Sequence, residues 1–282
     1  MYRIDKYYDS QQCCFIDLYA FNNCSGLTSV TILGNVTKFG STAFNGCAKL
    51  VEFIVPEENL SCSVLDGVLF NKDKTTLLFY PAGKEGNSYV IPNSVTLIDD
   101  YAFFMCSALT SVTIPNGVTS IGVSAFSGCS GLTTVTIPNG VTSIGDFAFS
   151  SCGNLVKIRC GNPQPIAISA YVFQLVNKKN CTLYVPKGSY AAYWIATGWG
   201  DFENIVEEEI TSINNPTPDT ISISADKGIL NIRVEVPTHI NIYTVLGTIV
   251  YSGIIENDES VPLNSGIYIV KAGKESHKVI VK

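Results

Sequence analysis

Histidine, methionine and tryptophan are scarce in this chain of 282 residues, which has only two of each. Both histidines, His239 and His277, lie near the C-terminal end, so the first 210 residues cannot form a Ser-His or Cys-His pair for nucleophilic catalysis. Phosphate-binding loop motifs are absent as well. Asp99 and Asp100 are sequence neighbours that we expect on a solvated edge, whereas the acids of a glycosidase converge across a cleft. We therefore expect no enzyme and no cofactor.

An excess of basic residues is also missing. Lys and Arg number 18 against 24 Asp and Glu, which gives a net charge of -6. Because nucleic-acid binding depends on clustered cations that neutralise phosphates, we expect no nucleic-acid partner. No run approaches the roughly 20 apolar residues of a membrane span, and residues 1–10 carry no secretory signal pattern. With 46% apolar residues, the chain can nevertheless bury a core and form two domains.

Five of the ten cysteines follow a fixed interval. Cys24 and Cys47 are 23 residues apart, and so are Cys106 and Cys129, then Cys129 and Cys152. The irregular step from Cys47 to Cys106 is 59 residues, which equals 23 plus 36. An insertion of that length fits between two equivalent Pro positions, at about residues 57–92. A constant period of this size predicts an array of stacked repeats.

Each repeat reads Leu-x-x-Val-x-Ile, Pro-Asn-Gly, Val-x-x-Ile-Gly and Ala-Phe-x-x-Cys. The alternation of apolar Val112 and Ile114 with Ser111 and Thr113 predicts a strand with one buried face. Asn-Gly tolerates positive φ and predicts a turn. The Ala-Phe pairs predict short helical turns, here called the Ala-Phe turns, whose rings fill the coil interior. They are Ala20-Phe21, Ala43-Phe44, Ala102-Phe103, Ala125-Phe126 and Ala148-Phe149.

Stacking places the cysteines in a column. Because neighbouring strands lie about 4.8 Å apart, like residues recur along the axis at that spacing, and free Cys behaves as a small hydrophobe. The sequence thus predicts a structural ladder of buried thiols, formed by Cys24, Cys47, Cys106, Cys129 and Cys152. Two alternatives are a disulfide framework and a zinc site. Parallel side chains disfavour disulfides, and no C-x-x-C spacing favours zinc, so we expect no metal.

The segment from Leu109 to Gly122, followed by Ala125-Phe-Ser-Gly-Cys129, resembles the BspA-type leucine-rich repeats of bacterial surface proteins. The resemblance covers residues 16 to about 206. It implies a curved solenoid with parallel strands that is exported and used for attachment or protein binding.

Both ends of the array, residues 1–210, need a cap. At the C-terminal end, about residues 161–206, we expect a strand at Leu183–Pro186 and a helix at Ser189–Thr197. Ser189 is its predicted N-cap and Gly198 its C-terminal glycine. Its predicted lid residues are Tyr190, Tyr193, Trp194 and Ile195. At the other end, either the array continues from a longer one, or residues 1–15, with Tyr7, Tyr8 and Phe15, form a cap.

The insertion contains two apolar runs, Ser63–Phe70 and Thr75–Tyr80, around the polar Asn71–Lys74. This pattern predicts a hairpin, with a further turn at Asp66-Gly67. We expect an oversized coil docked on the solenoid, and a binding element is the alternative.

Residues 211–219 form a Pro- and Asn-rich linker. Short apolar runs at 220–282 predict six or seven strands of a small β-sandwich. Ile242–Val250, Leu263–Val270 and the closing Lys278–Lys282 resemble the C-terminal sorting domains of type IX secretion cargo. The resemblance implies export across an outer membrane, and leaves open whether the domain is removed or anchors the protein.

One group of residues differs from the serine and threonine residues at most outward strand positions. Aromatic residues precede three Ala-Phe pairs, and two more large apolar residues follow Phe103, the ring of one of these pairs. Such residues are typical interface anchors, although rings in repeated positions can also merely stack. The candidate partner-binding face comprises Tyr19, Tyr101, Phe104, Met105 and Phe147.

The sequence as a whole predicts a mainly β protein: a leucine-rich repeat solenoid of 23-residue coils, followed by a β-sandwich. We expect a monomeric, extracellular or cell-surface binding protein whose partner is a protein or a glycan, with host extracellular matrix among the candidates. The alternative is an architectural spacer in a larger surface protein.

Overall fold

The computed structural model describes residues 15–34, 36–209, 221–226, 228–234, 238–245, 247–255, 258–272 and 275–281. The chain divides into two units, Met1–Ile213 and Asn214–Lys282. The predicted linker and the N-terminal cap residues Tyr7 and Tyr8 lie outside the described residues. The boundaries of the solenoid, linker and sandwich stay predictions.

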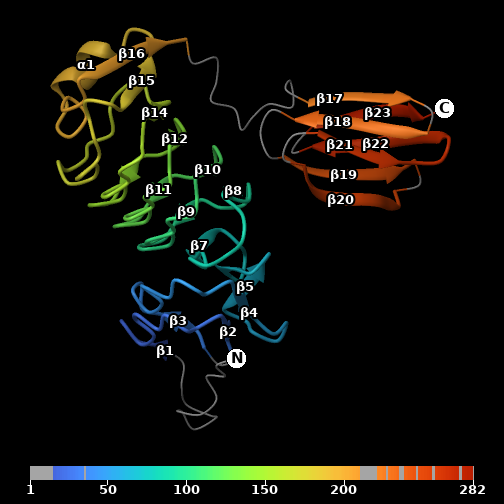
Figure 1. The fold of residues 1–282 in the computed structure, drawn as a ribbon, viewed down its shortest axis with the longest axis horizontal. Coiled ribbons are helices and arrows are strands. Elements are labelled where there is room, and N and C mark those ends of the chain that lie inside the picture. Colours follow the sequence, from blue (N-terminus) through green and yellow to red (C-terminus); the bar gives the residue numbers. More distant parts are fainter. Residues whose placement is uncertain are drawn as a thin grey trace. The chain divides into compact units, whose positions relative to one another are not determined.

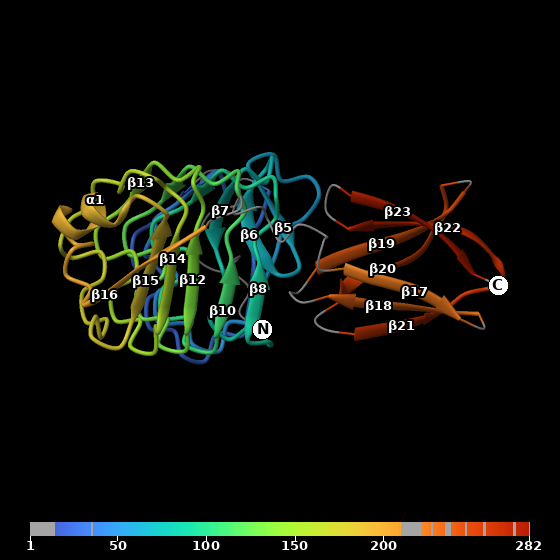
Figure 2. The ribbon, with the colours of Figure 1, turned by 90° about the horizontal axis from the view of Figure 1, so that it is seen from above.

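The first unit is a stack of coils in which strands run parallel along one side, here called the front (Figures 1 and 2). Six of them form the front sheet, in the order β16-β15-β14-β12-β10-β8, and β2 and β4 pair separately. Residues paired across neighbouring strands are one repeat of 23 residues apart in sequence, since Val112 lies opposite Val135. The front strands are β2 (Ser29–Thr31), β4 (Glu52–Ile54), β8 (Ser88–Val90), β10 (Ser111–Thr113), β12 (Thr134–Ile137), β14 (Lys157–Cys160), β15 (Thr182–Pro186) and β16 (Asn204–Glu208).

A second set of shorter strands forms the rear sheet, in the order β13-β11-β9-β7-β6-β5, with β1 and β3 paired separately. These strands are β1 (Phe15–Ile16), β3 (Lys38–Phe39), β5 (Cys62–Leu65), β6 (Val68–Asn71), β7 (Thr76–Phe79), β9 (Leu97–Ile98), β11 (Ser120–Ile121) and β13 (Ser143–Ile144). The Pro-Asn-Gly turns connect front to rear, and the Ala-Phe turns lead back to the next front strand.

Threonines at the turns bind each coil to the one before it. The hydroxyl of Thr142 donates to the carbonyl of Thr119 at 3.2 Å, and Thr119 donates to Thr96 at 3.2 Å. Thr133 makes the same contact with Thr110 at 3.2 Å. Hydroxyl donors on short side chains thus link successive coils in this part of the array, whereas Val156 and Pro165 take these positions one coil later.

The Ala-Phe rings stack along the axis. Ring centroids are 4.7 Å apart between Phe103 and Phe126, 5.2 Å between Phe126 and Phe149, and 5.6 Å between Phe149 and Phe173. All four side chains are fully buried. Phe173 extends the stack by a coil that the sequence pattern does not show, because it follows Phe149 by 24 residues and Val172 replaces Ala.

The insertion forms the predicted hairpins and joins the rear sheet. β5 pairs antiparallel with β6 across the Asp66-Gly67 turn, β6 pairs with β7, and β7 runs parallel to β9. The turn is held against β4 by the hydrogen bond from Phe53 N to Gly67 O, 2.9 Å, and its Asp66 forms an ion pair with Lys84, in the segment after β7, at 3.1 Å. The insertion is thus an oversized coil, and the buried residues on its two sides belong to separate core clusters.

The C-terminal end of the array has a helix, α1 (Tyr190–Ile195), but the predicted cap is wrong in detail. Ser189 occupies the N-cap position without capping, since its hydroxyl donates to Pro163 O at 2.8 Å. Of the four predicted lid residues only Tyr193 is buried in the helix. The fully buried Trp199 and Phe202, which pack on Phe173, complete the lid instead.

The second unit consists of antiparallel sheets of three and four strands, ordered β17-β18-β21 and β20-β19-β22-β23. Its core includes Leu230, Ile232, Ile240, Ile242 and Val270. The strands are β17 (Ile221–Asp226), β18 (Ile229–Val234), β19 (Thr238–Thr244), β20 (Ile249–Ile255), β21 (Asp258–Pro262), β22 (Gly266–Ala272) and β23 (Glu275–Val281). The prediction of a mainly β repeat solenoid followed by antiparallel sheets is confirmed.

Replacing Phe126 with Ala should lower the free energy of unfolding by about 3–5 kcal/mol, since it removes a buried ring that stacks on both sides. Phe21→Ala should cost less, because Phe21 is half-buried and stacks on Phe44 alone among the described residues. Urea unfolding followed by circular dichroism measures both values. Equal losses would contradict the axial stack as the main source of stability.

Candidate functional site

The predicted thiol column has a hydrogen-bonding role. Cys129 Sγ lies 3.0 Å from the carbonyl oxygen of Phe103, and Cys152 Sγ lies 3.2 Å from that of Phe126. Each of these carbonyls also accepts the backbone N–H three residues later, as Phe126 O does from Cys129 N at 3.2 Å. The thiol therefore uses the second lone pair of a carbonyl one coil earlier.

Burial distinguishes the members of this column. Cys47, Cys106, Cys129 and Cys152 are buried, whereas Cys24 is exposed, contrary to the expectation of a fully buried ladder. Cys24 lies in the outermost coil of the described residues, so no described coil precedes it to cover the thiol. The position of the residue in the stack, rather than its place in the repeat, decides its exposure.

The buried thiols have low reactivity, because their pKa values are raised and the thiolate is disfavoured. Burial raises the pKa of Cys47 to about 11 and that of Cys152 to about 12, and it raises the pKa of Cys106 and Cys129 as well. All eight cysteines that the structure describes are free. Within the described ranges, no three His, Cys, Asp or Glu side chains converge as metal ligands would.

The candidate face lies along the Ala-Phe turns, but it is not one cluster. Tyr101 and Phe104 are adjacent, with ring centroids 5.4 Å apart, and Met105 beside them is 53% exposed. Phe147, two coils further on, stacks instead on Tyr171 at 5.3 Å. The 23-residue pattern does not predict Tyr171, because this residue follows Phe147 by 24 residues. Tyr19 lies apart in the first described coil and is 61% exposed.

Four of the five candidate residues have left-handed backbone. The φ angle is 61° at Tyr19, 59° at Tyr101, 57° at Met105 and 61° at Phe147. The equivalent positions in the coil after Tyr101 hold Ser124, with φ 54°, and Gly128, with φ 76°. Bulky residues are rare in this region and cost about 1–2 kcal/mol there. The fold therefore accepts small residues where the candidate face has large ones.

Met105 extends along the array toward this neighbouring coil. A Cβ atom on Gly128 would lie 3.0 Å from Met105 Cγ, so the missing side chain of Gly128 leaves room for the methionine. Flexible, polarisable methionine side chains adapt to different partner surfaces. The group thus consists of the half-buried rings of Tyr101 and Phe104 and the exposed Met105, which extends over the smaller residues of the next coil.

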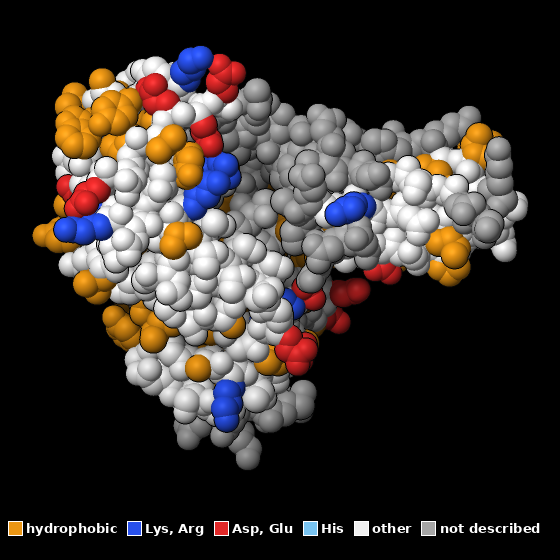
Figure 3. Space-filling model, turned by 45° about the horizontal axis from the view of Figure 1, so that its top comes forward, with side chains coloured by type: hydrophobic (Ala, Val, Ile, Leu, Met, Phe, Trp, Pro, Cys, Tyr) orange, Lys and Arg blue, Asp and Glu red, His pale blue; other side chains and the backbone are white. Residues whose placement is uncertain are grey.

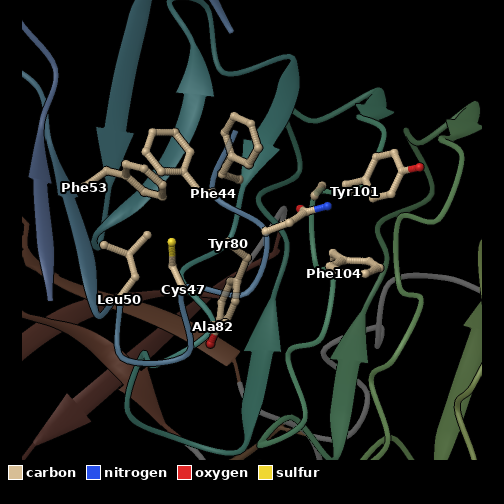
Figure 4. Close-up of a pocket in the computed structure, with 11 residues that line it drawn as sticks. Phe44, Cys47, Leu50, Phe53, Tyr80, Ala82, Tyr101 and Phe104 are labelled. Carbon is tan, nitrogen blue, oxygen red and sulfur yellow. The ribbon is translucent and has the colours of Figure 1, made fainter. Parts of the chain in front are cut away.

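Beside this group lies a cavity of about 20 Å³, where the coil of Phe44 and Cys47 meets that of Tyr101 and Phe104 (Figure 4). Residues of both core clusters line it, and Phe79 and Tyr80 of the insertion are among them. A volume of this size holds about one water molecule. The face therefore suits contact with a partner's surface rather than enclosure of a small molecule.

The neighbouring acids Asp99 and Asp100 accept hydrogen bonds from backbone N–H groups. Asp100 Oδ1 accepts a hydrogen bond from Val123 N in the next coil at 2.6 Å, and Asp99 Oδ1 accepts one from Asp100 N at 2.9 Å. Asp99 is half-buried rather than on the expected solvated edge, and this burial raises its pKa. The pair links successive Ala-Phe turns.

Comparisons with known proteins agree with this architecture. Residues 4–74 and 78–187 match the family described as "BspA type Leucine rich repeat region", in six copies. Residues 215–282 match the family described as "Secretion system C-terminal sorting domain". Both resemblances stated above are confirmed. A search of curated proteins finds no match.

Similar solved structures include three bacterial leucine-rich repeat proteins. A protein from Eubacterium ventriosum shares 30% identity at a TM-score of 0.49, with 56% of this chain and 42% of that one covered. The pneumococcal vaccine antigen PcpA shares 21% identity at a TM-score of 0.46, with 65% of this chain and 56% of that one covered. A leucine-rich cell surface protein from Faecalibacterium prausnitzii shares 24% identity at a TM-score of 0.41, with 64% of this chain and 48% of that one covered. The chain thus spans about half the length of these structures. Among the described residues, no helix is long and apolar enough to span a membrane.

Alkylation with iodoacetamide at pH 8 should modify Cys24 rapidly and leave Cys106, Cys129 and Cys152 unmodified. The reagent attacks the thiolate, and burial keeps these three thiols protonated. Peptide mass spectrometry measures the difference, with alkylation in 6 M guanidinium as the control in which all four react. Because the folded pKa values lie above that of an unfolded thiol, stability should also fall as pH rises above about 9.

Proposed function

Because the chain belongs to the family of BspA-type leucine-rich repeat proteins, we propose that it is an exported binding protein that adheres to a protein partner through its Ala-Phe turns. The family comprises surface proteins of the binding or adhesion type. The proposed contact residues are Tyr101, Phe104 and Met105, with Phe147 and Tyr171 two and three coils further along and Tyr19 near the N-terminal end.

The observation that carries this proposal is the left-handed backbone beneath large side chains, of which Tyr19 and Met105 are exposed and Tyr101 and Phe147 are half-buried. Ser124 and Gly128 occupy the same positions as Tyr101 and Met105 in the neighbouring coil, with positive φ. Closing a coil thus requires no ring or thioether at these positions. Strained backbone beneath large side chains that the fold does not need is typical of functional sites. The apolar surface of these side chains therefore supports binding rather than folding.

The chemistry of these residues favours a protein partner. Aromatic rings and methionine are enriched in the buried centres of protein interfaces, where a few such anchors supply most of the binding energy. The adjoining cavity of about 20 Å³ is too small for a separate ligand. An apolar patch with adaptable side chains suits contact with another protein surface.

A triple variant that copies the next coil tests the face. Tyr101→Ser, Phe104→Ser and Met105→Gly introduce the residues found at Ser124, Ser127 and Gly128, so the coil should still form. Surface plasmon resonance against a panel of purified extracellular-matrix proteins should show binding by the unmodified chain and at least about tenfold weaker binding by the variant.

The matched control is Leu60→Ser, which removes an exposed apolar side chain, 82% exposed, from the insertion. It should leave affinity unchanged. Equal affinity of the triple variant and the unmodified chain would overturn the proposed face. Weaker binding by both variants would show that general surface hydrophobicity, not this face, is responsible.

The match of residues 215–282 to a secretion sorting domain supports export. Deleting these residues should retain the protein inside a host cell that has such a secretion system, because the recognised segment is gone. Cell fractionation and immunoblotting measure this outcome, with Leu60→Ser as the control that still leaves the cell. Export of the shortened chain would contradict the proposed route.

A further inference from the structure

The outward side of the front sheet carries a different chemistry from the Ala-Phe turns. Two rows of side chains cross its strands, and most of their members are polar. The first row aligns Ser111, Thr134, Lys157, Thr182 and Asn204. The second aligns Thr136, Arg159, Tyr184 and Val206. Successive positions in a row lie about 4.8 Å apart.

The hydroxyl groups in these rows are available to a ligand. Threonines at the turns, such as Thr133 and Thr142, use their hydroxyls to bind the preceding coil. In contrast, the side chains of Thr134, Thr136 and Thr182 make no hydrogen bond to any other residue in the described ranges. Threonine on the front sheet therefore presents free donors and acceptors to solvent.

Cations interrupt the hydroxyl rows at β14. Arg159 forms a two-point contact with Glu208, with Nε 2.7 Å from Oε1 and Nη2 3.4 Å from Oε2, so its charge is neutralised. Lys157 Nζ lies 4.6 Å from the ring centroid of Tyr184, and no carboxylate of the described residues lies within ion-pair distance of it. The site thus keeps one uncompensated positive charge.

The ring of Tyr184 holds both cations in place. The Arg159 guanidinium lies 5.4 Å from the same ring centroid as Lys157. Cation–π contact reduces the conformational freedom of a long side chain, and Lys157, Arg159 and Tyr184 are all half-buried. Lys157 is therefore preorganised among free hydroxyls. In Figure 3, uncharged surface predominates and charged side chains occur in small, scattered groups.

We propose that these rows bind an acidic polysaccharide: Lys157 takes a carboxylate or sulfate group, and Thr134, Thr136 and Thr182 bond the sugar hydroxyls. Charge complementarity selects the anionic group, because no carboxylate of the described residues forms an ion pair with Lys157. Centres of protein interfaces are instead depleted in Lys and Ser. The site is independent of the Ala-Phe turns, which lie on a different side of the coils.

The test uses the full chain and three probes of similar length: hyaluronan oligosaccharides, which carry carboxylates, dextran sulfate, which carries sulfates, and neutral dextran. Isothermal titration calorimetry should show binding to at least one anionic probe and none to neutral dextran. Lys157→Met should weaken that binding about tenfold, the loss typical of one charge-assisted hydrogen bond. Thr136→Val, which keeps the volume but removes the hydroxyl, should also weaken it.

Lys38→Met, which removes the same charge from β3 on the rear side, is the matched control and should bind like the unmodified chain. The proposal is overturned if neither anionic probe binds, if Lys38→Met loses as much as Lys157→Met, or if polyglutamate binds as tightly as the glycans. Should Lys157→Met not fold, Lys157→Gln replaces it. The Tyr101, Phe104 and Met105 triple variant should bind glycan normally, which separates this site from the proposed protein-binding face.

Discussion

Axial stacking of equivalent groups is the interaction on which the rest of the structure depends. Strands about 4.8 Å apart bring each phenyl ring, thiol and turn threonine onto its counterpart one coil away. Phe126 stacks between Phe103 and Phe149, and the thiol of Cys129 donates to the carbonyl of Phe103. No coil can bury its ring or use the second lone pair of this carbonyl alone, because the partner group belongs to the neighbouring coil.

This dependence divides the repeat into fixed and free positions. Inward positions must match the coil on either side, so their chemistry hardly varies: Phe, Cys, Val and Ile recur in place. Outward positions face solvent and can differ from coil to coil without disturbing the stack. Ser124 and Tyr101 occupy equivalent positions with the same left-handed backbone. The outward positions can therefore supply an apolar face at the turns and a polar, cationic one on the front sheet.

The interruptions of the array follow from the same rule. The insertion breaks the core into two clusters, and its Asp66-Gly67 turn bonds to Phe53 so that the edge of β4 is not left open. At the C-terminal end, Trp199 and Phe202 cover the ring of Phe173. In each case, irregular segments supply the contacts that a further regular coil would otherwise make.

The sequence by itself determined the repeat, its strands and turns, the insertion and the family, because a period imposed by backbone geometry leaves a local pattern. It also pointed to the residues of the candidate face. Only the tertiary structure decided which of them lie together, that Tyr171 joins Phe147, that Cys24 is exposed, and that Lys157 and Arg159 meet at Tyr184. These relations depend on where a coil lies in the stack and on side chains from different coils. A linear pattern does not encode such distances, because equivalent positions in sequence can have different neighbours in space.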